Sequence, residues 1–251
     1  MPSLRLGDLI PNFKANTTEG PIDFYTFQGK SWVIIFSHPA DFTPVCTTEL
    51  GRIAVHKEEF EKRNVKLLAH SCDKLGCHVE WVNDIKSYCK DMIGDFPYPI
   101  IADETRELAV KLDMIDQNNK DNEDRALTVR ALYVIDPAHK LRLSMQYPAS
   151  TGRNVDEMLR VVDSLQLVDK IPQIVTPANW VPGEKVMIVP TVSDAEAEKL
   201  FPGGVDRVSM PSGIVPTVSD AEAEKLFPGG VDRVSMPSGL TYVRTTTKYR
   251  M

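Results

Sequence analysis

The chain has 251 residues, of which 42% are hydrophobic and 25% charged, enough to bury a full core in one large domain, with or without a smaller annex. Its formal net charge of −6 and pI of about 5.4 argue against a nucleic-acid partner or an anionic lipid surface. The N-terminus lacks the apolar core of a secretory signal, and no segment approaches the roughly 18 apolar residues of a membrane span. Four cysteines in so long a chain do not form a disulfide framework, so we expect free thiols. Together, these features predict a cytoplasmic protein without a membrane span.

The first predicted elements form a β-α-β unit. Short apolar segments rich in β-branched residues, at 32–36 and 65–69, are bounded by polar residues and predict two buried parallel strands. Between them, residues 49–62 place apolar side chains at helical spacing among charged ones, which predicts an amphipathic helix.

Farther along, similar patterns predict more helices and strands. We expect helices over 78–87, 104–112 and 155–167, and strands over 100–102, 131–135 and 141–147. The last two strands are joined by Asp-Pro-Ala-His at 136–139, which predicts a turn between antiparallel neighbours. This order predicts an α/β domain of thioredoxin-like fold over residues 1–168.

Beyond Asp169 the composition changes, because prolines interrupt the chain at short intervals. We therefore expect a smaller, less regular C-terminal α+β arm over residues 169–251. Within it, residues 188–213 are repeated without a change as residues 214–239. Two identical copies lack the third unit and the diverged ends of a solenoid, so the repeat indicates a recent tandem duplication or an error in the sequence. Ser193 begins a capped-helix pattern, so each copy is able to form a short helix.

The residues after the first strand place a thiol where a helix begins. Residues 38–49 read His-Pro-Ala-Asp-Phe-Thr-Pro-Val-Cys-Thr-Thr-Glu, which puts Cys46 at a strand-to-helix turn. A lone cysteine is more often a small buried hydrophobe. Here, however, the unpaired N–H groups of the first helical turn favour the reactive thiolate. Pro39 and Pro44 stiffen the approach, and Thr43 lies within reach of the sulfur or of a substrate oxygen beside it.

The spacing Pro-x-x-x-Thr-x-x-Cys, followed by Thr-Thr-Glu, resembles the peroxidatic motif of the peroxiredoxins. The similarity extends from about Leu4 to the C-terminus, interrupted by the duplication, and is greatest with the one-cysteine, peroxiredoxin-6-like branch. It implies a thiol peroxidase without a cofactor, which reduces hydrogen peroxide and organic or lipid hydroperoxides through a sulfenic acid on Cys46. It also implies that the C-terminal arm packs on a second subunit in a homodimer.

The resemblance assigns further residues to the site. Arg130 matches the catalytic arginine, whose charged fork of donors stabilises the thiolate and the departing oxygen, and Arg153 matches a second arginine behind it. Glu49, one helical turn after Cys46, is placed to orient an arginine, and His38 is placed to donate to the substrate or to tune the thiolate. Plainer interpretations stay open for the last two, as a helix-surface carboxylate and as a histidine satisfied by the backbone.

Two other features narrow the expected chemistry. Cys72, Cys77 and His78 lie close together in the sequence but lack the second half of a zinc site, so we expect no metal. In two-cysteine relatives, a second cysteine near the C-terminal junction resolves the sulfenic acid. Thr176 stands at that position here. The resemblance therefore implies an external thiol reductant such as glutathione, delivered by a glutathione transferase in some members.

Two alternative functions remain. Some members of the branch carry a calcium-independent phospholipase A2 activity, attributed to a serine, a histidine and an aspartate. Here Ser31 is present, but Tyr25 and Ala138 occupy the positions of its two partners, so we expect weak or no lipase activity. The other alternative is a peroxide sensor or chaperone-like oligomer, which passes the oxidation of Cys46 to a partner protein.

Overall fold

The computed structural model describes residues 4–116, 127–208 and 243–246. The chain divides into two compact units, Met1–Leu159 and Arg160–Met251. Helix α6 (Val155–Lys170) contains this division and also the predicted domain boundary between residues 168 and 169. The assignment of domains at that boundary stays a prediction.

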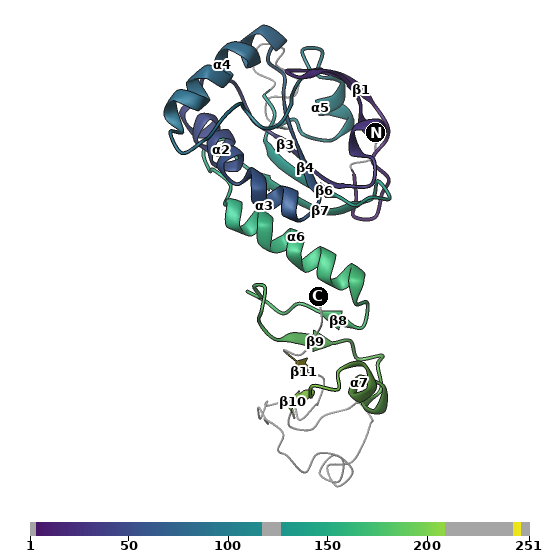
Figure 1. Ribbon diagram of the computed structural model, residues 1–251. Helices are drawn as coiled ribbons and strands as arrows, with labels where there is room; N and C mark the ends of the chain where they lie inside the picture. Colours follow the sequence, from purple (N-terminus) through teal and green to yellow (C-terminus); the bar gives the residue numbers. More distant parts are fainter. Residues whose placement is uncertain (1–3, 117–126, 209–242, 247–251) are drawn as a thin grey trace. The chain divides into compact units, whose positions relative to one another are not determined.

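The first unit is built on a seven-stranded mixed sheet in the order β2-β1-β5-β4-β3-β6-β7 (Figure 1). Its strands are β1 (Lys14–Thr17), β2 (Gly20–Asp23), β3 (Trp32–Ser37), β4 (Val65–Ser71), β5 (Ile100–Ala102), β6 (Arg130–Ile135) and β7 (Leu141–Tyr147). The helices between them are α1 (Phe24–Gln28), α2 (Pro44–Val55), α3 (Lys57–Lys62), α4 (Leu75–Tyr88) and α5 (Glu107–Lys111). Helices α2, α3 and α4 lie on one side of the sheet and α5 on the other (Figure 1).

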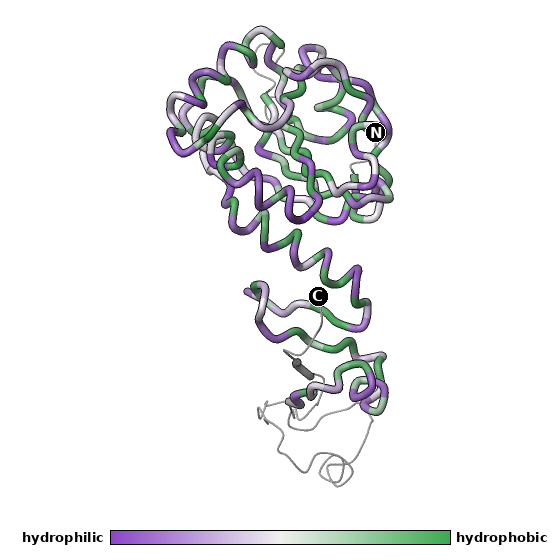
Figure 2. The backbone as a smooth tube through the Cα atoms, in the orientation of Figure 1, coloured by the Kyte–Doolittle hydropathy of each residue, from purple (hydrophilic) through white to green (hydrophobic). Residues whose placement is uncertain are grey.

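The centre of the sheet is β3, which pairs parallel with β4 and antiparallel with β6. Every residue of β3 and β6 is buried, and the central strands form a continuous hydrophobic region in Figure 2. Side chains alternate across a strand, so the two faces of β3 serve different cores. Ile35 packs with Phe24 and Leu108 in one core cluster, whereas Phe36 meets the ring of Tyr98 edge-on.

The predicted β-α-β unit is confirmed, with one change in its helix. The strands expected at 32–36 and 65–69 are β3 and β4, which pair in parallel. The helix expected over 49–62 begins earlier, at Pro44, and is broken at His56 into α2 and α3. His56 Nδ1 lies 2.8 Å from the Arg52 carbonyl oxygen. The apolar pattern continues across this break, so the sequence pattern predicted one helix.

The other predicted strands and helices of this unit are also present, with shifted ends. Strands β5, β6 and β7 are confirmed, and the last two pair antiparallel across the predicted turn. Helix α5 is shorter than predicted, because Arg106 adopts a left-handed φ of 61° immediately before it. The hairpin of β1 and β2 and the short helix α1 were not predicted.

The second unit contains a four-stranded sheet in the order β10-β11-β9-β8. Its elements are β8 (Ile174–Val175), β9 (Val186–Ile188), α7 (Asp194–Leu200), β10 (Asp206–Val208) and β11 (Val243–Thr246). As predicted, a helix follows Ser193, whose hydroxyl accepts a hydrogen bond from the Glu196 amide at 3.3 Å. This helix belongs to the first copy of the repeat, whereas the second copy, residues 214–239, lies outside the described residues. Among the helices that are described, none has the length and apolar character needed to cross a membrane.

Candidate active site

Cys46 lies in the first turn of α2, where the chain returns from the end of β3. Thr43 is the N-cap residue with an extended backbone, and Pro44 occupies an early helical position where no N–H is needed. The Thr47 amide donates to the Thr43 carbonyl at 3.0 Å, so the N–H groups before Thr47 have no partner within the helix. The Cys46 side chain is fully buried. The thiol therefore sits at the positive end of a helix, away from water.

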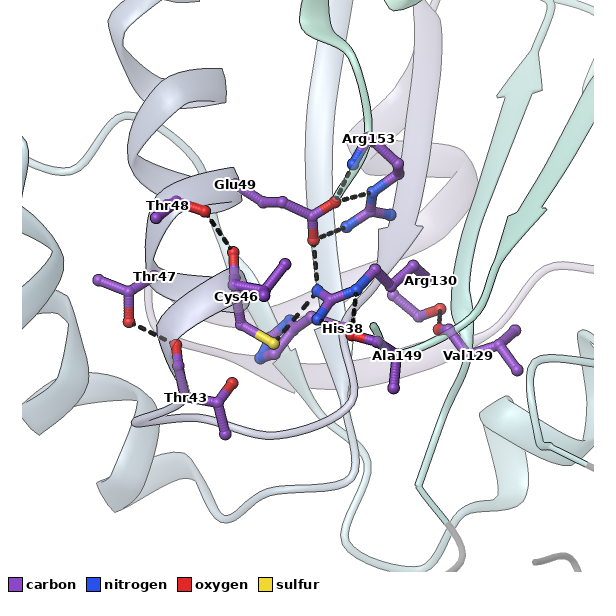
Figure 3. A network of polar contacts seen from close by, with 12 residues as sticks. His38, Thr43, Cys46, Thr47, Thr48, Glu49, Val129, Arg130, Ala149 and Arg153 are labelled. Carbon is purple, nitrogen blue, oxygen red and sulfur yellow. Dashed lines mark hydrogen bonds and ion pairs between the residues drawn. The ribbon is translucent and has the colours of Figure 1, made fainter. Parts of the chain in front are cut away.

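Arg130, the first residue of β6, contacts the sulfur directly (Figure 3). Its Nη1 donates to Cys46 Sγ at 3.3 Å and to Glu49 Oε2 at 2.6 Å. Its Nε and Nη2 both donate to the Ala149 carbonyl, at 3.1 and 2.6 Å. The guanidinium is thus fixed in position, with its charge available to a thiolate or to a departing oxygen.

Glu49 links the two predicted arginines. The Arg153 amide and Nε donate to Glu49 Oε1 at 2.6 and 2.9 Å, and Arg153 Nη2 donates to Oε2 at 3.0 Å. Burial raises the pKa of Glu49, but the charge and hydrogen bonds of Arg153 and the charge of Arg130 outweigh burial and hold this pKa below its usual value. One buried carboxylate therefore faces two buried guanidinium groups. This leaves one net positive charge beside the Cys46 sulfur, where it can stabilise negative charge that develops during a reaction.

The hydroxyl of Thr43 bonds within its own loop and not to the sulfur, and its predicted contact with a substrate oxygen stays a prediction. It donates to the Ala40 carbonyl at 2.8 Å, and none of the hydrogen bonds among the described residues joins it to Sγ. With its hydrogen used in this way, Thr43 Oγ1 is able to meet a ligand only as an acceptor. Pro39 lies in the loop between β3 and α2, as expected.

His38 belongs to a buried cluster that the sequence pattern did not predict. His38 Nε2 lies 2.8 Å from Asp41 Oδ1, and His78 Nδ1 lies 2.6 Å from Asp41 Oδ2. Burial lowers the pKa of His38 despite its hydrogen bond to Asp41. Burial raises the pKa of Asp41, but the hydrogen bonds from both histidines outweigh this effect and lower it. Asp41 lies within the cysteine motif, but no sequence signal connects it with His78.

The three ligand atoms of this cluster lie within 4.8 Å of one another, which also suits a metal ion. The two nitrogen–oxygen distances, however, are those of hydrogen bonds. The expected absence of a metal stays a prediction.

The remaining cysteines differ from Cys46 in their surroundings. All four thiols are free. Burial raises the pKa of Cys72 to about 12, and burial also raises the pKa of Cys89. Cys77 lies in α4 and Cys89 follows that helix. Among the cysteines, only Cys46 receives a hydrogen bond from an arginine in the described part of the chain.

Taken with the strand order, the thiol–arginine pair defines the class of molecule: an enzyme of thioredoxin-like fold that works through a cysteine thiolate. Comparison with known proteins narrows this class. The model of the AhpC/TSA family matches residues 6–144, and the model of the C-terminal domain of 1-Cys peroxiredoxin matches residues 164–204. Peroxiredoxin-6 of Gallus gallus is 54% identical over 214 residues, covering 85% of this chain and 95% of the relative. Peroxiredoxin-6 of Homo sapiens is 53% identical over 211 residues, covering 84% and 94%.

Solved structures agree with the sequence relatives. A cysteine-to-serine mutant of peroxiredoxin 6 from Arenicola marina matches with a TM-score of 0.82 at 45% identity, covering 99% of this chain and 100% of that one. The yeast mitochondrial 1-Cys peroxiredoxin matches with a TM-score of 0.76 at 41% identity, covering 97% and 99%. The chain belongs to the peroxiredoxin family, in its one-cysteine, peroxiredoxin-6-like branch, and is a thiol peroxidase.

Proposed function

We propose that Cys46 is the peroxidatic residue. We also propose that Arg130 stabilises negative charge first on the Cys46 thiolate and then on the departing oxygen of the peroxide. The observation that carries this assignment is the 3.3 Å contact between Arg130 Nη1 and Cys46 Sγ. The thiolate attacks the terminal oxygen of a hydroperoxide ROOH, so that an S–O bond forms and the O–O bond breaks. The bonding electron pair leaves with RO⁻, which takes a proton from water, and Cys46 becomes a sulfenic acid. Arg130 stays charged throughout, while Glu49 and Arg153 hold it in place.

Stopped-flow mixing of the reduced protein with hydrogen peroxide tests the assignment. We expect rapid, stoichiometric loss of peroxide, abolished in Cys46→Ser and retained in Cys72→Ser, Cys77→Ser and Cys89→Ser. Retained consumption in Cys46→Ser would refute the role of this thiol. Slow consumption that ends in a stable mixed disulfide with a partner protein would instead support the sensor or chaperone function.

Regeneration requires a thiol from outside the chain, and we propose glutathione. Two molecules would reduce the sulfenic acid, giving the Cys46 thiol, oxidised glutathione and water. Two points support this proposal: the resemblance to the family places Thr176 where two-cysteine relatives have a resolving cysteine, and the yeast relative has a thiol-resolving mechanism via glutathione and thioredoxin systems. Peroxide turnover measured with glutathione, with and without a glutathione transferase, should exceed turnover with thioredoxin and its reductase. The reverse order would refute the proposal.

The proposed assembly is a cytoplasmic homodimer, because the resemblance implies that the C-terminal arm packs on a second subunit. Light scattering on the purified chain at micromolar concentration should give the mass of two subunits. A monomer mass would contradict the dimer.

The surroundings of Ser31 support the expectation of weak or no lipase activity. Its hydroxyl donates to Asn64 Oδ1 at 2.8 Å, and the Tyr25 hydroxyl donates to the Ile10 carbonyl at 2.8 Å. Neither contact supplies a base that would activate the serine. Robust release of fatty acid from phosphatidylcholine, lost in Ser31→Ala, would contradict this expectation.

A further inference from the structure

The last turn of α2 borders a hollow of about 510 Å³ in the surface of the first unit. Glu19, the adjoining ends of α2 and α3, and residues 91–97 line it, and we call it the α2–α3 hollow. Its volume is that of a site for a small molecule. Cys46 lies at the other end of α2, about 12 Å away along the helix axis, and is not among the described residues that line the hollow. The α2–α3 hollow is therefore separate from the peroxide site.

The floor of the α2–α3 hollow is apolar and held in place from below. The Phe96 ring packs on the ring of Tyr98, with centroids 4.5 Å apart, and the Tyr98 hydroxyl donates to the Leu50 carbonyl of α2 at 2.7 Å. The Met92 amide donates to the Cys89 carbonyl at 3.0 Å. Such a floor is formed before a ligand binds, as in most small-molecule sites. Its buried and half-buried apolar side chains are those of Ala54, Val55, Met92, Phe96 and Pro97.

An exposed apolar side chain extends this floor at the rim. Ile93 is 96% exposed, the largest exposed fraction among the large hydrophobic side chains that are described. A single exposed isoleucine on a flat surface would be ordinary. Ile93, however, lines a hollow whose floor is apolar, so a ligand seated there would remove both from water. The α2–α3 hollow therefore suits a ligand with an apolar body.

The rim carries negative charge. Two of the charged groups that line it already have partners, because Lys57 Nζ lies 3.5 Å from Glu61 Oε1 and Asp95 Oδ1 lies 3.4 Å from Lys86 Nζ. The other charged groups of the rim are carboxylates, and they belong to no ion pair in the described part of the chain: Glu19, Glu58 and Asp91.

Glu19 shows what this charge lacks. Burial raises the pKa of Glu19, although the charge of Lys57 lowers it. Its carboxylate is thus partly withdrawn from water and is compensated only by an amine that is bonded elsewhere. A cationic group beside Glu19 would favour the ionised carboxylate, whereas an anionic one would oppose it. The charge of the rim therefore selects a cation as the polar part of a ligand.

We propose that the α2–α3 hollow binds an amphiphilic amine, whose alkyl body lies on the apolar floor while its ammonium group lies among Glu19, Glu58 and Asp91. This inference goes beyond the peroxidase function and does not depend on it. A fatty acid would bring its carboxylate to the acidic rim, and a neutral alcohol would leave the rim without a cation. A hollow of this volume accepts a small molecule, whereas a stable protein partner would need a much larger contact surface.

Isothermal titration of the full chain at pH 7 tests the ligand class with three probes of one chain length: octylammonium, octanol and octanoate. Each is kept below the concentration at which it forms micelles. We expect octylammonium to bind about tenfold more tightly than octanol, the combined scale of a few exposed ion pairs, and octanoate to bind least. The advantage of octylammonium should shrink as sodium chloride is raised from about 20 to 200 mM, because salt screens the rim. Equal binding of octylammonium and octanol, tighter binding of octanoate, or no binding of octylammonium would overturn the proposal.

Variants at exposed positions test the two parts of the hollow without disturbing the core. In the double variant Glu19→Gln, Asp91→Asn, we expect the affinity for octylammonium to fall about fivefold and that for octanol to stay unchanged. The matched control is Glu80→Gln, Asp84→Asn, which removes the same charge from exposed positions of α4 outside the lining and should change neither affinity by more than about twofold. Equal losses in the two double variants would contradict a site at this rim.

Two further measurements locate the site. Ile93→Ser should weaken octylammonium and octanol alike, because both place their alkyl chain on the floor. In two-dimensional NMR, octylammonium should shift the amide signals of residues 54–58 and 91–97, and shifts confined to other residues would overturn the proposal. Cys46→Ser should bind octylammonium as the unsubstituted chain does, since Cys46 does not line the hollow. Failure of the peroxidase assignment would thus leave this binding intact, and failure of the binding would leave the peroxidase assignment intact.

Discussion

At the scale of single residues, Glu49 holds the site together, because it is the shared partner of Arg130 and Arg153. Glu49→Gln leaves two buried guanidinium groups without their carboxylate, so we expect a loss of about 3–5 kcal/mol in the free energy of unfolding. We also expect the peroxide rate to fall by about 100-fold, since Arg130 loses the group that aims it at the sulfur. Urea unfolding and stopped-flow kinetics measure the two effects.

The matched control is Glu59→Gln. Glu59 also pairs with two cations, Lys62 and Arg63, but its side chain is 41% exposed. Surface ion pairs contribute little, so this variant should unfold at nearly the wild-type urea concentration and keep the wild-type peroxide rate. Similar losses in the two variants would show that Glu49 has no special role.

Three buried groups also predict how stability depends on pH. The pKa of His38 is lowered chiefly by burial, and its neutral form is favoured in the folded state. Its contribution is therefore present above the unfolded value of about 6.5 and is lost as the pH falls. Burial raises the pKa of Glu49 and Asp41, but their hydrogen-bonded partners lower it by a larger amount, so the net shift is downward. Their contribution is present above about pH 4 and is lost as the pH falls through their folded-state values.

The free energy of unfolding, measured in urea between pH 8 and pH 3, should therefore decline in two stages. Glu49→Gln should show a shallower decline below pH 4, and His38→Gln a shallower decline between about pH 7 and 5. A wild-type curve that is flat across this range would contradict the assigned protonation states.

At the scale of secondary-structure elements, the close packing of α2 on α4 depends on Gly51. A methyl group built there would lie 3.0 Å from Cys89 Cβ and 3.2 Å from Cys89 Sγ. We expect Gly51→Ala to lower the free energy of unfolding by about 1–3 kcal/mol through overpacking. Gly76→Ala, in α4 where a methyl group meets nothing within 4 Å, should instead raise it by about 0.4–1 kcal/mol. Thermal and urea unfolding of the two variants test these expectations. A stabilised Gly51→Ala would show that the helices separate easily.

The strands also show which parts of the fold could be predicted from the sequence. Strands β3, β4 and β6 were predicted because their apolar residues are contiguous and buried on both faces. The β1–β2 hairpin was missed because it lies at the sheet edge with mostly exposed or half-buried residues. Its turn depends on the positive φ of Gly20, 101°.

The candidate site likewise has one part that was predicted from the sequence and one part that was not. Cys46, Arg130, Glu49 and Arg153 were predicted as a group, and the structure brings them together. His78 was considered only as a metal ligand, because its contact with Asp41 joins residues of different elements and leaves no local pattern.

At the scale of the whole molecule, the duplicated segment does not interrupt the pairing of the C-terminal sheet. Val208 of β10 is paired with Val243 of β11, and the second copy, residues 214–239, lies between them in the sequence. The first copy already supplies α7 and β10. Because the copies are identical, deleting either one produces the same chain, in which β10 and β11 are joined by a shorter connection.

We therefore expect deletion of residues 214–239 to leave the peroxide rate unchanged or improved, since Cys46, Glu49 and Arg130 all belong to the first unit. The free energy of unfolding should not fall, since the deletion retains the paired strands β10 and β11. Stopped-flow kinetics and urea unfolding measure both effects. A chain with residues 214–239 scrambled at constant length is the control, and it should match the parent chain in rate. If both the deletion and the scrambled chain lose activity, the second copy has a specific structural role, because neither length nor composition alone would then account for the loss.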